Sequence, residues 1–219
     1  FKSISFNKTD AGMLSVLVAQ NGTGKTTIIN GILSLFDEMD LSCVLAAPTG
    51  RAAKRLTEVT GRDASTIHRL LEVGLDHRSG KLYFAKNIDN PIKADVIVVD
   101  EMSMVDIQLL SALLDGISEQ SRVILVGDPD QLPPVGPGFP FMDMLRSGVL
   151  PAVRLTEVFR QAQKSLIVVN AHRVNRGEMP ELNNVKKDFF FLPAQSEQAI
   201  EQTIVGLCAT RLPTKMGIP

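Results

Sequence analysis

The feature that most constrains the fold of this chain is a glycine-rich turn placed between an apolar run and a helix-like segment. The apolar run is Leu14–Val18, the turn carries the letters GTGKTT at positions 22–27, and the helix-like segment extends from Thr26 to Phe36. Glycines at such a turn let the backbone approach a ligand closely, and the first turn of a helix presents N–H groups and the positive end of its dipole to an anion. A strand, a glycine-rich turn and a helix in this order predict an α/β domain with a phosphate-binding loop.

Two side chains of this loop have the chemistry that a nucleotide requires. We expect the ammonium of Lys25 on the β- and γ-phosphates of ATP and the hydroxyl of Thr26 on Mg²⁺. The complete pattern G-x-x-x-x-G-K-[ST] has glycine at its first position, where this chain has Ala19. The alternative is a strand–helix connection that binds no ligand. The residues expected to bind the nucleotide are Gly22, Thr23, Gly24, Lys25, Thr26 and Thr27.

A second signal is an apolar strand that ends in two carboxylates. The run Ala94–Val99 is followed directly by Asp100 and Glu101. Because Mg²⁺ prefers hard oxygen ligands and keeps part of its hydration, we expect Asp100 in the metal shell together with Thr26. Glu101 is placed to orient and polarise the attacking water. Alone, such an acidic pair is often a solvated turn, but beside Lys25 and Thr26 in one α/β domain it predicts a site of nucleotide hydrolysis.

A third signal follows the strand expected at Arg122–Val126. The chain continues there as a polar, proline-rich turn with the letters GDPDQLPPV at positions 127–135. We expect the carboxamide of Gln131 to reach the γ-phosphate. The alternative is a proline-rich loop that only ends the strand.

Apolar strands and helix-like segments alternate along most of the chain. This alternation predicts an α/β fold with a mostly parallel sheet flanked by helices. The stretch Leu75–Pro91 interrupts the rhythm, and its turn residues and the alternation at Lys81–Ala85 predict a small inserted β-hairpin. The other expected elements are strands at Ser42–Ala47 and Phe189–Leu192 and helices at Arg51–Val59, Val105–Gly116, Phe139–Ser147, Lys164–Arg176 and Glu197–Leu212.

Composition and charge argue against several classes of protein. The chain has 23 basic and 24 acidic residues and a formal net charge of −1. This charge argues against a protein that coats DNA through its overall charge, but it does not exclude one that binds a DNA strand in a single local groove. No apolar run approaches the roughly 20 residues that span a bilayer, and positions 1–10 lack the apolar core of a signal peptide. We therefore expect a cytoplasmic protein without a membrane partner. The 2 cysteines and 3 histidines are scattered, which predicts neither a disulfide nor a zinc site.

Five segments of the chain occur together, and in this order, in one known family. They are Ala47–Leu56, Ser65–Leu71, Asp100–Asp106, Gly127–Gly138 and Arg154–Gln161. With them the chain resembles the first motor domain of superfamily 1 DNA helicases, in the RecD-like branch that includes exodeoxyribonuclease V alpha subunits and conjugative relaxase–helicases. The resemblance implies a P-loop NTPase (RecA-like) fold. It also implies hydrolysis of ATP with Mg²⁺ that drives 5′-to-3′ movement on single-stranded DNA and duplex unwinding in recombination and repair.

The resemblance also implies roles for single residues. Gln131 matches a γ-phosphate sensor that couples hydrolysis to strand movement, and Arg160 matches an arginine that contacts the γ-phosphate, where a guanidinium stabilises developing charge. The implied catalytic residues are Lys25, Glu101, Gln131 and Arg160. The positions that match the single-strand track are Pro48, Thr49, Arg51, Thr66 and His68. Without the family, Arg51 would be interpreted as part of a solvated helix face.

The resemblance further implies a domain arrangement. Residues 1–74 and 92–219 are expected to form the nucleotide-binding motor domain, and 75–91 an inserted hairpin that is either a strand-separating pin or a plain surface hairpin. The second RecA-like domain of the parent chain is expected outside these residues, so this piece alone should hydrolyse ATP weakly and should not unwind DNA processively. Expected partners are that second domain, single-stranded DNA, duplex junctions, and nuclease or helicase subunits.

Three other functions stay open on the sequence. One is the motor domain of a conjugative relaxase–helicase. Another is a catalytically weak scaffold that binds DNA, which Ala19 favours. The third is a P-loop enzyme that acts on a small molecule, such as a kinase, against which the loop at 127–138 argues. Stimulation of ATP hydrolysis by single-stranded DNA would separate the motors from the kinase.

Overall fold

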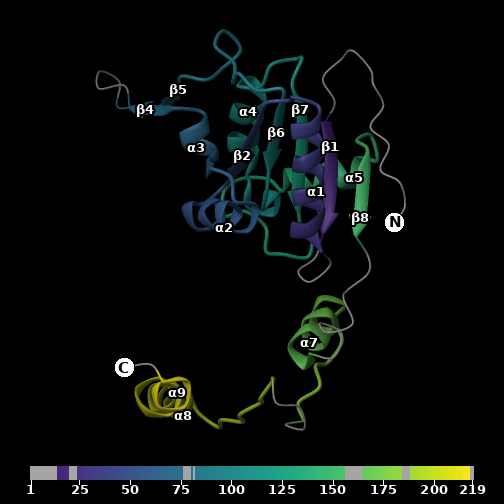
Figure 1. Ribbon diagram of the computed structural model, residues 1–219. Helices are drawn as coiled ribbons and strands as arrows, with labels where there is room; N and C mark the ends of the chain where they lie inside the picture. The colour runs from purple at the N-terminus through teal and green to yellow at the C-terminus, as the bar shows by residue number, and fades with distance from the viewer. Residues whose placement is uncertain are drawn as a thin grey trace. The chain divides into compact units, whose positions relative to one another are not determined.

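The computed structural model describes residues 14–19, 24–75, 80, 82–155, 165–183 and 188–217 of the chain. It divides into two compact units, Phe1–Phe159 and Arg160–Pro219, which are described separately below. The first unit contains the sheet and the segments with the sequence signals (Figure 1).

The first unit is built on a six-stranded sheet with the strand order β3-β2-β6-β7-β1-β8. Every pairing in this sheet is parallel, and the register places Val18 of β1 beside Gly127 of β7 and Val99 of β6 beside Leu125 of β7. The predicted parallel α/β fold is therefore confirmed. The strands are β1 (Leu14–Ala19), β2 (Cys43–Ala47), β3 (Ala64–Thr66), β6 (Val96–Val99), β7 (Arg122–Gly127) and β8 (Ala152–Leu155).

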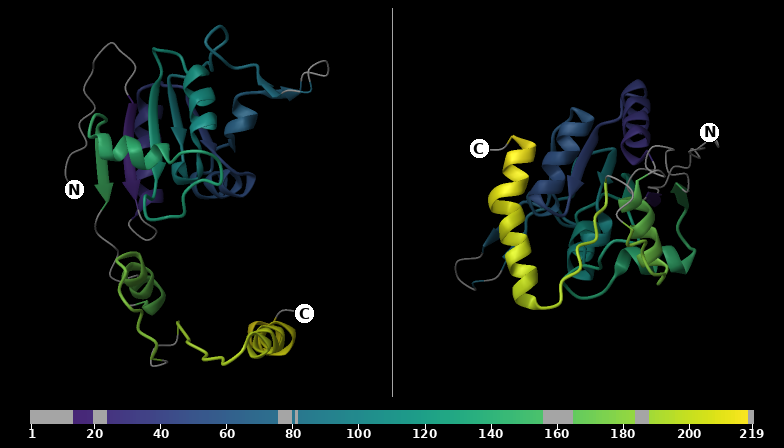
Figure 2. Two further views of the ribbon diagram at one scale, coloured as in Figure 1. Left: turned by 180° about the vertical axis from the view of Figure 1, so that it is seen from behind. Right: turned by 90° about the horizontal axis from the view of Figure 1, so that it is seen from below.

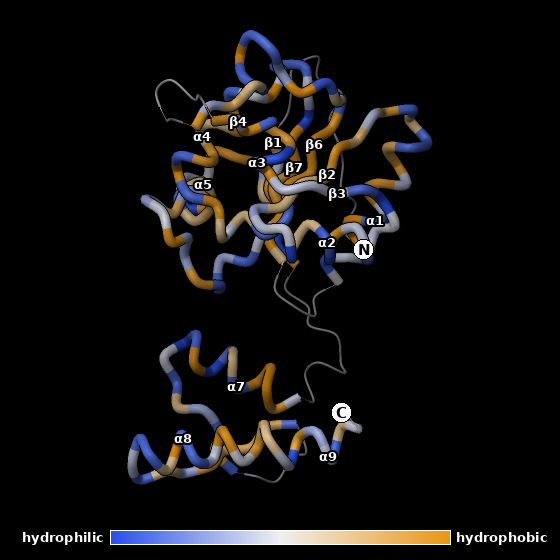
Figure 3. Tube along the Cα trace, turned by 90° about the vertical axis from the view of Figure 1, so that its left-hand side faces the viewer, coloured by the Kyte–Doolittle hydropathy of each residue, from blue (hydrophilic) through white to orange (hydrophobic). Residues whose placement is uncertain are grey.

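Helices cover both faces of the sheet, as the apolar character of its central strands requires. In the side view of Figure 3, α1 and α2 lie on one side of the strands and α4 and α5 lie on the other. The helical elements of this unit are α1 (Lys25–Glu38), α2 (Gly50–Thr60), α3 (Ile67–Leu70), the 3₁₀ turn η1 (Met102–Met104), α4 (Ile107–Asp115) and α5 (Pro140–Ser147).

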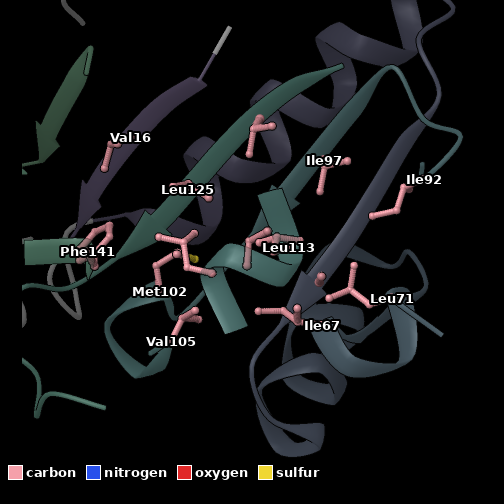
Figure 4. Packing of buried hydrophobic residues seen from close by; sticks show 14 of the residues in the cluster. Val16, Ile67, Leu71, Ile92, Ile97, Met102, Val105, Leu113, Leu125 and Phe141 are labelled. Atoms are coloured by element: carbon pink, nitrogen blue, oxygen red, sulfur yellow. The ribbon is translucent and has the colours of Figure 1, made fainter. Parts of the chain in front are cut away.

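Alternate residues of each central strand enter two separate cores. Ile97 and Val99 of β6 pack with Leu113, Phe141 and other residues under α4 and α5 (Figure 4). Their neighbours Val96 and Val98 pack on the opposite face with residues of α1 and α2. Truncation of a side chain in either core to alanine would cost about 2–5 kcal/mol, so the central strands hold the ends of their loops firmly in place.

The expected hairpin is present as a small antiparallel sheet. It consists of β4 (Val73–Leu75) and β5 (Leu82–Phe84), with Gly74 opposite Tyr83. The tip of the predicted insert, residues 76–79 and 81, lies outside the described residues. An ion pair of 3.7 Å between Lys86 and Glu72 ties the two arms at the base of the hairpin.

The second unit contains α7 (Leu166–Asn175), α8 (Glu197–Gly206), the π turn η2 (Leu207–Arg211) and α9 (Leu212–Met216). The last three form one continuous helical segment, visible in the right view of Figure 2, so the expected closing helix runs on to Met216. The strand expected at Phe189–Leu192 is wrong: no strand forms at these residues. The carboxylate of Asp188 accepts a hydrogen bond from the backbone N–H of Leu166, which places the start of this segment beside a helix terminus where no strand ladder is available. In the described part of the chain, no helix is both long and apolar enough to cross a membrane.

Candidate nucleotide site and adjoining groove

The sequence-predicted nucleotide residues meet at the carboxyl ends of three neighbouring strands. Lys25 is the first residue of α1, which follows β1, and Asp100 directly follows β6. Asp128 directly follows β7, which lies between β6 and β1 in the sheet. Open parallel sheets bind ligands at this edge, because the loops that leave the carboxyl ends of the strands converge there.

Lys25 forms two ion pairs at this edge. Its Nζ lies 3.0 Å from Oδ1 of Asp100 and 3.0 Å from Oε1 of Glu101. The side chains of Lys25, Asp100 and Glu101 are only 13%, 11% and 21% exposed, so these charges are poorly screened by water. Burial alone would lower the pKa of Lys25, but the charges and hydrogen bonds of the two carboxylates outweigh it and raise that pKa above its ordinary value of 10.5. Lys25 is therefore a firmly held cation at neutral pH.

The start of α1 is arranged to receive an anion. Gly24 caps the helix in a left-handed conformation with φ of 85°, which a residue with a side chain rarely adopts, and, having no side chain, it cannot cap the helix with a side-chain hydrogen bond. The first-turn N–H groups of Lys25, Thr26 and Thr27 therefore carry the unneutralised positive end of the dipole. Gly22 and Thr23, the other expected nucleotide residues, lie outside the described part of the chain.

The donor set of the site fits Mg²⁺. The hydroxyl of Thr26 and the carboxylate of Asp100 are hard oxygen ligands. The negative charges of Asp100, Glu101 and Asp128 together exceed the single positive charge of Lys25, so the charge balance of the site favours a further cation. Among the described residues, no three or more His, Cys, Asp or Glu side chains converge as a self-sufficient metal site. Mg²⁺ does not require one, because it binds through one or two protein ligands together with phosphate oxygens and water.

Glu101 has an unusual backbone conformation for a glutamate. Its φ of 57° lies in the left-handed region, which costs roughly 1–2 kcal/mol for a residue with a Cβ. The backbone N–H of Glu101 donates to Oδ1 of Asp100 over 2.8 Å, and this bond helps to hold the turn. Such strain tends to be retained where it aims a side chain at a ligand.

Asp128 is a site residue that the sequence reasoning did not assign. It is 7% exposed, and burial is the main reason why the pKa of its carboxyl is raised. A hydrogen bond from the N–H of Asp130 opposes that rise, and the charges of Lys25 and Glu101 also act on it. The sequence did contain a signal for Asp128: it directly follows the buried strand β7, just as Asp100 directly follows β6.

Gln131 is connected to the segment that follows the two carboxylates. The hydroxyl of Ser103 donates to Oε1 of Gln131 over 3.3 Å, and the N–H of Gln131 donates to the carbonyl oxygen of Asp128 over 3.2 Å. Farther along the loop, Gly136 packs against Asp106, and a Cβ at Gly136 would lie 1.9 Å from Oδ2 of Asp106. The absence of a side chain at Gly136 therefore allows the loop to lie against the start of α4.

A groove adjoins the nucleotide residues on the side of this loop. It has a volume of about 800 Å³ and a mainly apolar lining. Three of the five residues predicted to bind DNA line it, namely Pro48, Thr49 and His68, and Gln131 lines it as well. The rest of its lining comes from Met104, Asp106, Leu109, Asp130 and residues 132–136.

The five predicted DNA residues differ in what they already contact. The hydroxyls of Thr49 and Thr66 accept hydrogen bonds from the N–H groups of Ala52 and Arg69 and so cap α2 and α3. The ring of His68 lies 6.2 Å from that of Phe84 at an interplanar angle of 44°. Arg51 is exposed in the first turn of α2.

Two further sequence observations concern the ends of this site. Ala19, which replaces the first glycine of the loop pattern, is the last residue of β1, is 1% exposed and pairs with Leu155 of β8. An alanine methyl is therefore accommodated inside the sheet. Arg160, the fourth predicted catalytic residue, lies outside the described residues.

Comparison with known proteins gives a consistent result. Residues 4–137 match the family model described as AAA domain. Over 167 residues the chain is 43% identical to the ATP-dependent RecD2 DNA helicase of Deinococcus radiodurans, which covers 76% of this chain and 22% of that protein. It is 39% identical over 155 residues to the RecBCD enzyme subunit RecD of Mycolicibacterium smegmatis, covering 60% of this chain and 27% of that protein. The chain thus spans about a quarter of the length of these relatives.

A solved structure supports the fold independently. The crystal structure of the Pif1 helicase from Candida albicans matches with a TM-score of 0.54 at 22% sequence identity, over 78% of this chain and 42% of that one. At this identity the match is a likeness of fold alone.

Proposed function

This chain belongs to the AAA domain family as the first motor domain of a RecD-like superfamily 1 helicase, and we propose that it binds and hydrolyses ATP with Mg²⁺ to drive movement along single-stranded DNA. The observation that carries the proposal is the partly buried cluster in which Lys25 meets Asp100 and Glu101 at the glycine-capped start of α1. A cation, two carboxylates and free helix N–H groups are the parts that phosphoryl transfer to water requires.

Binding of ATP exchanges the partners of Lys25. The β- and γ-phosphates take the place of Asp100 and Glu101 around Nζ, while the N–H groups of Lys25, Thr26 and Thr27 contact phosphate oxygens. Asp100 would then be available to hold Mg²⁺ together with the hydroxyl of Thr26. When bound, Mg²⁺ neutralises charge on the β- and γ-phosphate oxygens.

Glu101 is released by the same exchange and acts on water. Its carboxylate accepts a hydrogen bond from the water whose oxygen bonds to the γ-phosphorus, while the bond from that phosphorus to the ADP oxygen breaks and its electron pair stays on ADP; the proton of the water passes through Glu101 to the released phosphate or to solvent. Lys25 stabilises charge on the transferred group throughout. Gln131 contacts the γ-phosphate from the loop after β7, and Arg160 is proposed as a second cation at the same group.

The groove is proposed as part of the track for single-stranded DNA. Its mainly apolar lining suits the faces of bases, on which proline and imidazole rings can stack. Pro48, Thr49 and His68 contribute from the groove itself, and Arg51 and Thr66 contribute from the adjacent ends of α2 and α3. Movement from 5′ to 3′ and a role in DNA recombination and repair are proposed on the family alone, and a conjugative relaxase–helicase is the alternative parent.

The wider arrangement is proposed on the same basis. The hairpin within residues 75–91 would separate strands at duplex junctions, and residues 1–74 and 92–219 would form the motor domain that carries it. A second RecA-like domain of the parent chain would close the ATP site, and nuclease or helicase subunits are proposed partners in the cytoplasm.

Steady-state ATP hydrolysis with and without single-stranded DNA tests the proposal, on a chain extended to include the second RecA-like domain. We expect strong stimulation by DNA that is lost in Lys25→Ala. The matched control is Lys54→Ala, because the side chain of Lys54 is 81% exposed and its ion pair with Glu58 is long, at 4.0 Å. Absence of hydrolysis in a folded extended protein would favour the DNA-binding scaffold, and hydrolysis that DNA does not stimulate would favour a small-molecule enzyme.

A further inference from the structure

Ser103 occupies a position between the two carboxylates and the loop that carries Gln131. It is the central residue of η1, two residues after Glu101, and is 0% exposed. Its hydroxyl donates to Oε1 of Gln131 over 3.3 Å. Nothing in the nucleotide chemistry described above uses this buried hydroxyl.

We propose that Ser103 is a positioning residue that orients the carboxamide of Gln131 so that its NH₂ group faces the γ-phosphate. The inference rests on the proposed function. A carboxamide has one end that accepts hydrogen bonds and one that donates them. Because Oε1 accepts from Ser103, Nε2 with its two protons is left for the anion. The reversed amide would turn its carbonyl oxygen toward the phosphate, and two negatively polarised oxygens repel each other.

Within the described residues, the backbone bonds around Gln131 do not orient its amide, so the Ser103 contact and the charge of the phosphate together select one orientation. The N–H of Gln131 is held by the carbonyl oxygen of Asp128 over 3.2 Å. At the far end of the loop the N–H of Ile107 donates to the carbonyl oxygen of Pro137 over 3.0 Å, and Gly136 packs on Asp106. These bonds fix where the loop lies, but none of them distinguishes the two ends of the carboxamide.

The length of the hydrogen bond between Ser103 and Gln131 suits a bond that orients the amide better than one that stabilises the fold. At 3.3 Å it is longer than the usual 2.5–3.0 Å or so of hydroxyl–oxygen bonds, and bonds in ligand-free sites commonly tighten in the reacting complex. Gln131 also lines the groove with Pro48 and His68. The amide that Ser103 orients thus lies between the nucleotide residues and the proposed DNA track, and a reversed amide would weaken the response to DNA.

The test is a double-mutant cycle on ATP hydrolysis at saturating single-stranded DNA, with the chain extended by the second RecA-like domain. We expect Gln131→Ala to lower kcat about 100- to 1,000-fold. Ser103→Ala should lower kcat roughly 3- to 10-fold, the effect of one hydrogen bond, with KM for ATP nearly unchanged. The variant that carries both changes should hydrolyse no more slowly than Gln131→Ala, because Ser103 acts only through that amide. Ser103→Cys, with a weaker donor of similar shape, should fall between Ser103→Ala and the unmodified protein, and it replaces Ser103→Ala if that variant does not fold.

Ser121 provides the matched control. It is also buried, at 5% exposure, and its hydroxyl donates over 2.7 Å to the carbonyl oxygen of Ala94, at the opposite end of the sheet from the nucleotide residues. Ser121→Ala should lower the melting temperature without changing kcat or its stimulation by DNA. An equal loss of kcat in Ser121→Ala and Ser103→Ala would reduce the role of Ser103 to packing and overturn the inference.

The outcomes separate this inference from the proposed function. If the unmodified protein lacks hydrolysis that depends on Lys25 and is stimulated by DNA, the proposed function itself fails. If that activity is present but Ser103→Ala matches the unmodified protein, the positioning role of Ser103 is refuted. The role is also refuted if the losses from Ser103→Ala and Gln131→Ala multiply, since independent residues give multiplicative effects.

Discussion

The nucleotide residues and the groove residues lie on neighbouring loops of one sheet but are held in different ways. On the nucleotide side, Lys25, Asp100 and Glu101 are bound to one another, and their charges have few other partners in the described structure. On the groove side, Thr49 and Thr66 use their hydroxyls to cap helices. One set is held by mutual charge, and the other takes part in the local fold.

This difference affects what a substitution can show. A change at a residue held only by charge alters chemistry more than structure, because the sheet beneath it remains packed. A change at a helix cap alters stability and binding together, so a loss of DNA affinity by itself would not show that the residue touches DNA. The predictions below test whether the two sides separate in this way.

The largest effect is expected at Glu101. Glu101→Gln removes the carboxylate that accepts a hydrogen bond from the attacking water, and hydrolysis should fall about 10²- to 10⁴-fold. Nucleotide binding should persist, because Lys25 and the N–H groups at the start of α1, which are proposed to contact the phosphates, are unchanged. Steady-state kcat and titration with a fluorescent nucleotide measure the two quantities. Glu58→Gln, at a glutamate whose side chain is 63% exposed on α2, is the control. A kcat within threefold of that of the unmodified protein would show that Glu101 takes no part in hydrolysis, and the proposed difference between the two sides would then be wrong.

Much of the fold was predictable because the central strands are continuous apolar runs. β1, β2, β6 and β7 were all expected, as were the helices that follow β1 and β2. The missed strands are the two edges of the sheet: β3 has three half-buried residues, and β8 is largely exposed and includes Arg154. Their strand character comes from pairing with β2 and β1, which a local pattern does not reveal. Conversely, Phe189–Leu192 has a strand-like composition, but the described residues of its unit contain no strand with which it could pair.

The candidate site was predictable where residue type and position along a strand suffice. Lys25, Asp100 and Glu101 were found in this way, and the structure brings them together. Asp128 was missed because its nearness to Lys25 depends on the register of β7 beside β1, which places Gly127 opposite Val18. The cap roles of Thr49 and Thr66 were also missed: the resemblance suggested contacts with DNA for these residues, and the structure shows in addition that their hydroxyls accept hydrogen bonds from the local backbone.

Thr49 tests the groove side directly. Thr49→Ala removes the cap of α2 and should cost about 0.5–2 kcal/mol, seen as a lower melting temperature. Thr49→Asp keeps a good cap, so its stability should stay close to that of the unmodified protein. Its negative charge should nevertheless weaken binding of single-stranded DNA more than Thr49→Ala does, by repulsion of phosphates. If DNA affinity follows stability across both variants, Thr49 acts only as a cap and the groove loses one proposed contact.

Arg51 should behave as the exception on the groove side, since it is exposed and the cap of α2 is Thr49 rather than Arg51. Arg51→Ala should leave the melting temperature unchanged and weaken DNA binding a few-fold. Loss of one phosphate contact should also make the dependence of log affinity on log salt shallower by about one. The control is Lys93→Ala, an exposed lysine before β6, at the opposite end of the sheet. An unchanged salt dependence in Arg51→Ala would show that Arg51 does not contact DNA phosphates and belongs to a solvated helix face.

The smallest expected effect is a pH dependence that only the nucleotide side should show. Because the carboxylates raise the pKa of Lys25 above 10.5, its ion pairs stabilise the fold fully below 10.5 and are lost as pH rises through the higher, folded-state value. Lys25→Met should therefore lower the melting temperature near neutral pH, and its gap to the unmodified protein should close above pH 10.5. Burial raises the pKa of the Cys43 thiol to about 11, but this group is present in both proteins and cancels in the difference.

Thr49→Ala supplies the other half of that pH experiment. A hydroxyl cap does not titrate, so the gap in melting temperature between Thr49→Ala and the unmodified protein should stay constant over the same pH range. Melting curves of the three proteins at a series of alkaline pH values measure both gaps. A gap that closes for Lys25→Met and persists for Thr49→Ala would establish that charge holds one side and local backbone bonds hold the other. Parallel behaviour of the two gaps would mean that the ion pairs of Lys25 contribute nothing to stability, and the distinction between the two sides would fail.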